Sequence, residues 1–185
     1  MTTWQSASVA FLAAAEGTER VELTEPWQAV RDIGGRPVLV SPAPREIQLF
    51  DHLDRAATMP VDVQAAVADP GEYVGLVLPG GVANPDQLRT DADAVAFVRG
   101  FLEAGQPVAA ICHAPWTLIE ADGVRDRTLT SWPSLRTDLR NAGATWVDEQ
   151  VVVCEQGPSV LVTSRRPQDL PAFCAAFTEV FGTYL

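Results

Sequence analysis

The sequence predicts an α/β protein in which a mostly parallel sheet is covered by helices on both faces. Short apolar runs rich in β-branched residues alternate along the chain with longer stretches whose apolar residues recur at helical spacing. These strand candidates are apolar at consecutive positions, as expected of strands buried on both faces. The chain has 185 residues, 47% of them apolar and 20% charged. This is enough for a substantial core, and we predict a single domain over residues 1–185.

The N-terminal part of the chain supplies the first elements of this alternation. A helix begins near Arg20, where apolar residues recur every three or four positions, and Gly34 and Gly35 end it. Residues 42–70 are less regular and rich in proline, which indicates a short hairpin or loop. The predicted elements are, in order, a strand at 8–13, a helix at 20–33, a strand at 37–41, and the hairpin or loop with segments at 46–50 and 61–67.

The regular pattern returns at residue 73. The apolar run 73–78 ends in Pro79-Gly80-Gly81, and a helix begins near Asn84, because asparagine is a good N-cap and proline suits the first helical position. The remaining elements are a helix at 92–104, a strand at 107–111, a helix of about ten residues after Cys112, an extended segment at 128–131, a helix at 134–141, strands at 145–147, 151–154 and 160–163, and a last helix at 168–181. Ligands of such sheets bind beyond the carboxyl ends of the strands, where Cys112 and the Gly80-Gly81 turn both lie.

Composition excludes several classes of partner. The formal net charge of −11 argues against nucleic acid and anionic membranes, which both attract positively charged surfaces. No apolar run approaches membrane-spanning length, and no basic leader with a cleavable apolar stretch begins the chain, so we expect a cytoplasmic protein. The three cysteines are an odd number without a closely spaced pair, which is typical of neither a disulfide framework nor a zinc site.

The residue types that are scarce or absent narrow the chemistry further. All thirteen basic side chains are arginine, which excludes a lysine Schiff base or a lysine general base. His52 and His113 are the only histidines, so we expect no multi-histidine metal site. The sequence contains neither GxGxxG nor GxxxxGK[ST], and nothing in it supports dinucleotide or nucleoside triphosphate binding. We therefore expect no metal and no cofactor.

Cys112 stands out as the candidate nucleophile. The segment Ala110-Ile111-Cys112-His113-Ala114 joins a strand to a helix in the pattern small-x-nucleophile-x-small, which is the nucleophile elbow with cysteine in place of serine. The sharp turn forces the central residue into a strained conformation and lifts its side chain into the crevice at the sheet edge. We expect the nearby helix N-terminus to lower the thiol pKa and favour the thiolate, and backbone N–H groups to hold an oxyanion.

The other cysteines and histidines are expected to be structural. Cys154 ends a run of β-branched residues, and Cys174 lies among aromatic residues at helical spacing, so we interpret both as core cysteines. The side chain of His113 is expected to point away along the elbow, and a role as base needs a rotamer that brings it back. His52 lies between two nearby aspartates and is interpreted as a loop histidine held by them, rather than as a metal ligand.

Several motifs in the same order resemble the ThiJ/PfpI superfamily, and in particular its branch of PfpI-type intracellular proteases and general stress proteins. The segments that carry the resemblance, over nearly the whole chain, are Gly17-Thr18-Glu19-Arg20-Val21-Glu22-Leu23, Leu78-Pro79-Gly80-Gly81, Asn84-Pro85-Asp86-Gln87-Leu88-Arg89, Ala110-Ile111-Cys112-His113, Thr130-Ser131-Trp132-Pro133-Ser134 and Leu161-Val162-Thr163-Ser164-Arg165. The resemblance implies a flavodoxin-like three-layer sandwich, similar to class I glutamine amidotransferases, with a mostly parallel central sheet.

The resemblance also implies roles for residues around the cysteine. Cys112 matches the nucleophilic and oxidisable cysteine, and Glu22 matches the glutamate that hydrogen-bonds the thiol. Glu19 is a second acid at the same helix end, three residues away and on the same face. The backbone N–H groups of Gly81 and His113 match the oxyanion hole.

The same resemblance implies an oligomer. His113 matches a proposed triad histidine, and Asp86 falls where relatives carry an acid that reaches this histidine from a neighbouring subunit. A homo-oligomer, a dimer or larger, is therefore expected. Gly80, Trp116 and Trp132 are expected to shape the substrate pocket. Three departures from the pattern are Ala114, where relatives usually have glycine, Trp132, where some have tyrosine, and the end of the first strand at Ala13-Ala14-Ala15-Glu16, where an acidic-glycine turn is more usual.

Two functional hypotheses follow. In the first, the chain is a cysteine-dependent hydrolase or lyase that protects against stress by acting on small reactive carbonyl compounds, glycated thiols or amines, or peptides. In the alternative, it is a non-enzymatic oxidative-stress sensor or chaperone with an oxidisable Cys112. A glutamine amidotransferase activity is excluded, because that enzyme needs a histidine well downstream of the cysteine and none follows His113.

Overall fold

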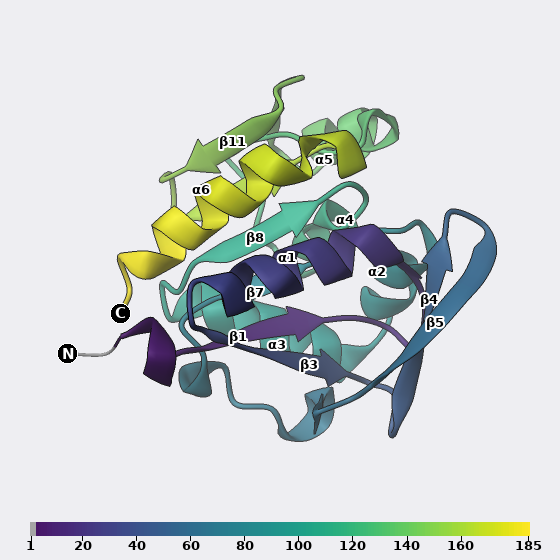
Figure 1. Cartoon of the computed structure of the whole chain (residues 1–185). Helices are drawn as coiled ribbons and strands as arrows, with labels where there is room; N and C mark the ends of the chain where they lie inside the picture. Colours follow the sequence, from purple (N-terminus) through teal and green to yellow (C-terminus); the bar gives the residue numbers. More distant parts are fainter. Residues whose placement is uncertain (1–2) are drawn as a thin grey trace.

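A seven-stranded sheet forms the centre of the protein in the computed structural model, which describes residues 3–185 (Figure 1). The strands lie in the order β11-β12-β8-β7-β1-β3-β6, and every neighbouring pair is parallel except β11 with β12. Their bounds are β1 (Ser8–Leu12), β3 (Arg36–Ser41), β6 (Val63–Gln64), β7 (Leu76–Leu78), β8 (Val108–Ile111), β11 (Val151–Cys154) and β12 (Leu161–Ser164). The predicted α/β class with a mostly parallel sheet is confirmed.

Helices cover both faces of this sheet and complete three layers. Figure 1 shows α1 (Arg20–Asp32) and α6 (Leu170–Gly182) side by side on one face. The other face carries α3 (Ala92–Glu103) and α4 (Pro115–Glu120), with α2 (Ala83–Leu88) and α5 (Arg136–Asn141) near its edges. Each face encloses its own cluster of buried apolar side chains, because β1, β7 and β8 alternate their residues between the two. Among residues 3–185, no helix combines the length and apolar character needed to cross a membrane.

Two smaller sheets flank the carboxyl ends of the central strands. One has three strands, β2 (Glu16–Glu19), β4 (Glu46–Asp51) and β5 (Asp54–Pro60); the other pairs β9 (Thr128–Leu129) with β10 (Thr145–Trp146). A hairpin is present within residues 42–70, and its first strand matches the predicted segment at 46–50. Its second strand is β5 rather than the predicted segment at 61–67, which instead contains β6 of the central sheet and a 3₁₀ turn. The apolar pattern of the sequence does not predict β2, because Gly17 and two acids interrupt it there. Short 3₁₀ turns cover Trp4–Ser6, Ala65–Val67, Pro70–Glu72, Pro133–Leu135 and Pro167–Asp169.

Several predicted helix boundaries are wrong. The helix after Cys112 has six residues rather than about ten, and it ends before Asp122, which adopts a positive φ of 57°. Prolines start 3₁₀ turns ahead of α5 and α6, so these helices begin later than predicted.

Asn84 is not the N-cap of α2, which begins at Ala83. Its fully buried amide instead accepts a hydrogen bond from the N–H of Ala14 (2.7 Å) and donates to the carbonyls of Pro79 (2.9 Å) and Gly80 (3.1 Å). These buried bonds satisfy loop backbone groups that have no water to bind. Asn84 thus joins the end of β1 to the loop that follows β7.

Candidate active site

The strand-to-helix turn at Cys112 has the predicted elbow geometry. Cys112 has a φ of 63°, which is strained for a residue with a side chain. The surrounding structure holds it there, because its N–H donates to the carbonyl of Ser164 (3.0 Å) and its carbonyl accepts from the N–H of Trp132 (2.9 Å). Ala114 has ordinary helical angles, φ −52° and ψ −32°, so alanine fits the position without strain.

Three glycines let the neighbouring loops approach the thiol. A Cβ on Gly80 would come within 2.7 Å of the Cys112 Cβ, and a Cβ on Gly81 within 2.0 Å of the Gly17 carbonyl oxygen. Gly17 and Gly81 also have φ values of 91° and 85°. This close approach brings β2 and the loop after β7 against the elbow, and with them the start of α1. Gly80 therefore lies beside the thiol and beneath the cavity, and it is not among the residues that line the cavity.

Glu22 on α1 is fully buried with its carboxyl facing the thiol of Cys112. Burial raises the pKa of Glu22 from 4.5 to about 8; the thiol and the N–H groups of Gly80 and Gly81 oppose this shift, and the charge of Glu19 adds to it. Neither carboxyl oxygen has a hydrogen bond of full geometry within the described chain. At neutral pH the Glu22 carboxyl is thus mostly protonated and can donate a hydrogen bond.

The expected low pKa of Cys112 is wrong. Burial raises the thiol pKa well above its ordinary value, and Glu22 raises it further when its carboxyl is ionised. The N–H groups of Gly81 and His113 point toward the sulfur and lower the pKa, but they do not outweigh these effects. Neither N–H binds a backbone carbonyl among residues 3–185, so both remain available to an oxyanion. The elbow therefore holds a protonated thiol that needs a base at the moment of reaction.

His113 supplies a base within reach. Its side chain does not point away along the elbow, as the sequence suggested; its Nδ1 lies 3.1 Å from the Cys112 Sγ. The ring is held between Trp116, at 5.5 Å between centroids, and Trp132, stacked at 5.6 Å with an interplanar angle of 23°. Ser134 Oγ lies 3.4 Å from its Nε2. Burial lowers the pKa of His113 to about 4, so the imidazole is neutral at physiological pH and can accept a proton.

A cavity of about 660 Å³ opens above the sulfur. It is lined by Glu16, Gly17, Glu19, Glu22, Phe50, His52, Leu53, Gly81, Val82, Ala83, Asp86, Cys112, His113, Trp132 and Pro167. Trp132 thus lies in the pocket wall, as predicted. Trp116 does not; it lies behind the His113 ring, donates from Nε1 to Asp138 Oδ2 (2.8 Å) and is covered by the Arg89 guanidinium. The cavity is of the size that holds small molecules.

The remaining acids lie at the mouth of the cavity. Glu19 comes directly before α1, and its Oε2 accepts a hydrogen bond from the N–H of His52 at 3.0 Å. His52 is therefore held by Glu19 rather than by the neighbouring aspartates, since Asp51 is paired with Arg20. Asp86 is exposed and pairs with Arg89 at 2.6 Å, and within one chain it does not hydrogen-bond His113.

Cys154 and Cys174 lie away from this cavity. Cys154 is buried, as expected of a core residue, whereas Cys174 is partly exposed. Burial raises the pKa of the Cys174 thiol to about 12, so it remains protonated at physiological pH. Within residues 3–185, no three or more histidine, cysteine or acidic side chains are grouped so that they could hold a metal ion.

Four site residues are missed by sequence reasoning. Ser134 contacts the His113 ring, while Ser131, Trp146 and Ser164 support the backbone on either side of Cys112. The three serines, Ser131, Ser134 and Ser164, lie in segments that carry the family resemblance. That resemblance is the one signal in the sequence that could have indicated them. Trp146 carries no such signal.

The fold and the site define a class of α/β proteins in which a cysteine elbow and a buried glutamate meet at the edge of a parallel sheet. The chain belongs to the DJ-1/PfpI family, whose family model matches residues 7–180. It is 46% identical over 126 residues to "Protein/nucleic acid deglycase 2" of Escherichia coli, covering 68% of this chain and 71% of the relative. It is 38% identical over 157 residues to "General stress protein 18" of Bacillus subtilis, covering 84% and 87%.

Solved structures show the same fold. A two-domain protein of Anabaena variabilis, with DJ-1/ThiJ/PfpI-like and ferritin-like domains, superposes with a TM-score of 0.86 at 31% identity. The match covers 95% of this chain and 48% of that one. A relative from Archaeoglobus fulgidus, 46% identical over 113 residues, is likewise matched over only 64% of its length. The chain thus spans less than two thirds of both of these proteins.

Proposed function

We propose that the protein is a cysteine-dependent hydrolase that removes carbonyl-derived groups from glycated amines or thiols, in protection of the cytoplasm against stress. The observation that carries this proposal is the placement of the Cys112 sulfur at the base of a cavity, 3.1 Å from the neutral His113 ring. The names of the relatives, a deglycase and a general stress protein, agree with it.

In the proposed reaction, His113 activates the thiol. The Cys112 Sγ attacks the carbon of the adduct that bears both the hydroxyl and the amine or thiol; a carbon–sulfur bond forms, the bond from that carbon to the leaving group breaks, and the thiol proton passes to His113 Nδ1. The hydroxyl oxygen on that carbon faces the N–H groups of Gly81 and His113. The protonated imidazole returns its proton to the departing amine or thiol, so that the leaving group departs neutral. Water then displaces the sulfur from the same carbon, which restores the thiol and releases the carbonyl compound as its hydrate.

Glu22 supports the developing negative charge on sulfur. A protonated carboxyl donates a hydrogen bond to a thiolate, whereas an ionised carboxylate repels it. The pKa of Glu22, raised to about 8 by burial, keeps the carboxyl in its donating form at neutral pH. Glu22 is therefore an acid at rest, and His113 is the base.

The cavity favours small adducts. Its walls are mostly apolar, from Phe50, Leu53, Val82 and Trp132, and its volume is about 660 Å³. Such a site accommodates a short glycated fragment and excludes a folded polypeptide. Free reactive carbonyl compounds and short peptides remain alternative substrates for the same thiol.

A substrate panel tests the proposal. The protein is incubated separately with the methylglyoxal adducts of N-acetyl-lysine, N-acetyl-arginine and N-acetyl-cysteine, with free methylglyoxal, and with a short unmodified peptide. We expect release of free amine or thiol from the adducts, faster than free methylglyoxal alone is consumed under matched conditions. If consumption of free methylglyoxal is fast enough to account for all release of amine or thiol, the protein is a glyoxalase rather than a deglycase. Cleavage of the peptide alone would favour a peptidase.

The sensor alternative is less well supported. Peroxide oxidises the thiolate, and burial raises the thiol pKa of Cys112 well above its ordinary value. Mass spectrometry after mild peroxide treatment distinguishes the two hypotheses. Oxidation of Cys112 far ahead of Cys154 and Cys174 would favour the sensor, and comparable oxidation of the three would exclude it.

We further propose that the site is completed in a homo-oligomer. In a single chain the Asp86 carboxylate lines the cavity mouth, exposed and paired with Arg89. The position is open to a second copy, whose His113 the carboxylate would then reach. Leu53 and Val82, exposed apolar residues at the same mouth, would be covered by that contact.

A further inference from the structure

We propose that Ser131, together with Trp146, is a positioning pair that holds the Trp132 indole against the His113 imidazole and so keeps Nδ1 of His113 at the Cys112 sulfur. The catalytic consequence of this arrangement depends on the proposed function, in which His113 accepts the thiol proton. The arrangement itself does not, and it is measurable without any substrate.

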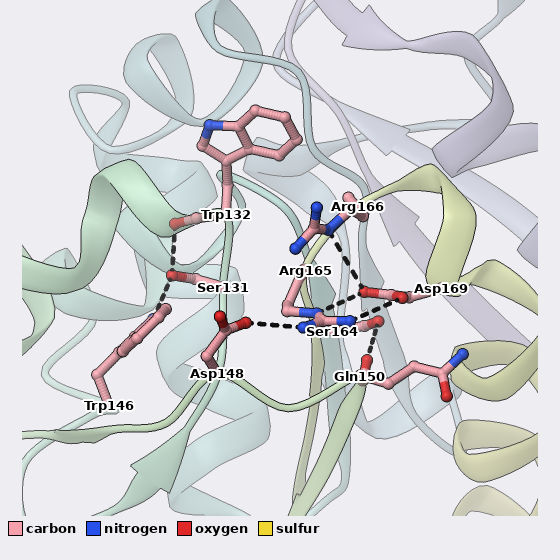
Figure 2. Close-up of polar contacts among 9 residues, drawn as sticks. All are labelled: Ser131, Trp132, Trp146, Asp148, Gln150, Ser164, Arg165, Arg166 and Asp169. Carbon is pink, nitrogen blue, oxygen red and sulfur yellow. Dashed lines mark hydrogen bonds and ion pairs between the residues drawn. The ribbon is translucent and has the colours of Figure 1, made fainter.

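A buried hydroxyl connects the two tryptophans. Figure 2 shows Ser131 between Trp146 and the backbone of Trp132. Ser131 is fully buried; its Oγ accepts a hydrogen bond from Trp146 Nε1 at 3.0 Å and donates one to the Trp132 carbonyl at 2.9 Å. Because the indole N–H occupies the oxygen as acceptor, the hydroxyl proton is directed at the carbonyl. The orientation of the hydroxyl, and with it the bond to Trp132, therefore depends on Trp146.

These two hydrogen bonds hold Trp132, which burial alone does not hold in place. Trp132 is 37% exposed and lies in a loop. Its N–H donates to the Cys112 carbonyl at 2.9 Å, so the peptide groups on both sides of its Cα are held, one by the elbow and the other by Ser131. Its indole stacks on His113 at 5.6 Å. Without the Ser131 bond, one side of Trp132 is free to move, and the stacked ring moves with it.

The opposite face of the imidazole is held independently. Trp116 packs at 5.5 Å from the His113 ring and is anchored on α5 through Asp138. Loss of Ser131 therefore uncovers one face and leaves the other in place. Water then reaches the ring, and the pKa of His113 rises toward its ordinary value because burial is what lowers it. The other titratable groups around the ring, Cys112 at Nδ1, Glu22 beyond the sulfur and Asp138 behind Trp116, are unchanged.

A second hydroxyl on the other side of the elbow provides a matched control. Ser164 is also fully buried and donates from Oγ to the carbonyl of Gln150 at 2.7 Å. Figure 2 shows this bond beside Arg165, which holds Asp148 (2.7 Å) and Asp169 (2.8 Å). Ser164 supports the N–H side of Cys112, away from Trp132. Ser164→Ala thus removes a buried hydroxyl-to-carbonyl hydrogen bond of the same kind without affecting the Trp132 indole that covers the His113 ring.

The experiment is a pH titration by NMR of protein labelled with ¹⁵N-histidine. Only two histidines are present, and the exposed His52 serves as an internal reference. We expect Ser131→Ala to raise the His113 pKa by about one unit and to broaden or shift its Nδ1 resonance, with the His52 resonances the same as in the wild type. Trp146→Phe, which keeps the ring and removes the donor, should give a smaller shift in the same direction. Ser164→Ala should leave His113 as in the wild type.

Two results would overturn the proposal. One is a His113 titration equal to that of the wild type in folded Ser131→Ala and in Trp146→Phe; if Ser131→Ala does not fold, Trp146→Phe alone decides. The other is an equal shift in Ser164→Ala, which would indicate general loosening of the elbow. Where the substrate panel detects turnover, Ser131→Ala should lower kcat about tenfold with a smaller change in KM. An absence of turnover would refute the proposed function and leave the histidine titration as the test of the positioning pair.

Discussion

The Sγ of Cys112 lies 3.1 Å from Nδ1 of His113, the next residue in the chain. Adjacent side chains in a regular strand point to opposite faces, and this pair meets because Cys112 adopts a φ of 63° at the elbow. Glu22 faces the same sulfur from α1. A thiol, an imidazole and a carboxyl therefore lie together at the base of the cavity, and the protonation state of each should affect the reaction.

The rate should depend on pH through two of these groups. His113, with a pKa lowered to about 4, must be neutral to accept the thiol proton, so activity is lost as the pH falls through about 4. Glu22, with a pKa raised to about 8, must be protonated to donate to the sulfur, so activity is lost as the pH rises through about 8. We expect a bell-shaped profile of kcat/KM with limbs near these values. A profile that rises steadily to pH 10 would mean that free thiolate formation alone controls the rate.

Glu22→Gln should change the pH dependence of stability. In the wild type, Glu22 ionises in the unfolded chain above its ordinary pKa of 4.5 but in the folded protein only near 8. Stability is thus lost as the pH rises from about 4.5 to 8, by roughly 3–5 kcal/mol from this group. The variant lacks this ionisable group. The loss of unfolding free energy between pH 5 and pH 8, measured in urea, should therefore be smaller in the variant than in the wild type. Comparing each protein with itself cancels the cost of burying the amide. Equal losses in the two proteins would show that Glu22 is not a buried acid with a raised pKa.

Gly81→Ala should be far more damaging than Gly34→Ala. Both glycines have a φ near +90°, so each substitution incurs a similar backbone strain of about 1–2 kcal/mol. The space around them differs, because a Cβ on Gly81 would lie 2.0 Å from the Gly17 carbonyl oxygen, whereas the nearest atom to a Cβ on Gly34 is 3.7 Å away. We expect Gly34→Ala to lower Tm by a few degrees and Gly81→Ala to lower it much further and abolish activity. Similar Tm values for the two variants would contradict the close approach of β2 to the loop after β7.

Asp86 tests the proposed oligomer. Light scattering should give a dimer or larger assembly for the wild type, and Asp86→Asn should lower kcat/KM about tenfold while the assembly persists. Asp93→Asn, at an exposed acid in the first turn of α3 and outside the cavity, serves as the comparison. A strictly monomeric protein with full activity would refute the contribution of a second subunit.

The alternation of apolar runs and helical patterns was sufficient to predict the fold class, because strands buried on both faces leave a continuous apolar signature. The elbow could also be predicted, since small residues must flank the turn at Cys112. The helix boundaries were predicted less accurately. Prolines at 133 and 167 begin 3₁₀ turns rather than α-helices, a choice made by local packing that periodicity does not encode.

The electrostatics of the site could not be predicted in the same way. The pKa of Cys112 depends on how deeply the sulfur is buried and on the approach of Glu22 from a distant helix, and neither is visible in the local sequence. A helix N-terminus alone suggested the opposite direction. The rotamer of His113 likewise depends on Trp132 and Ser134, about twenty residues downstream, which reach the ring only in the folded protein.

The nucleophilic role of Cys112 is tested by comparing turnover of the N-acetyl-lysine adduct of methylglyoxal by Cys112→Ala, by Cys154→Ala and by the wild type. Folding of all three proteins is checked by circular dichroism. Cys154 is buried away from the cavity, so its loss controls for removal of a thiol as such. We predict that Cys112→Ala lowers kcat/KM at least about a thousandfold and that Cys154→Ala stays near the wild-type rate. Retained turnover by a folded Cys112→Ala protein would contradict the assignment of Cys112 as the nucleophile.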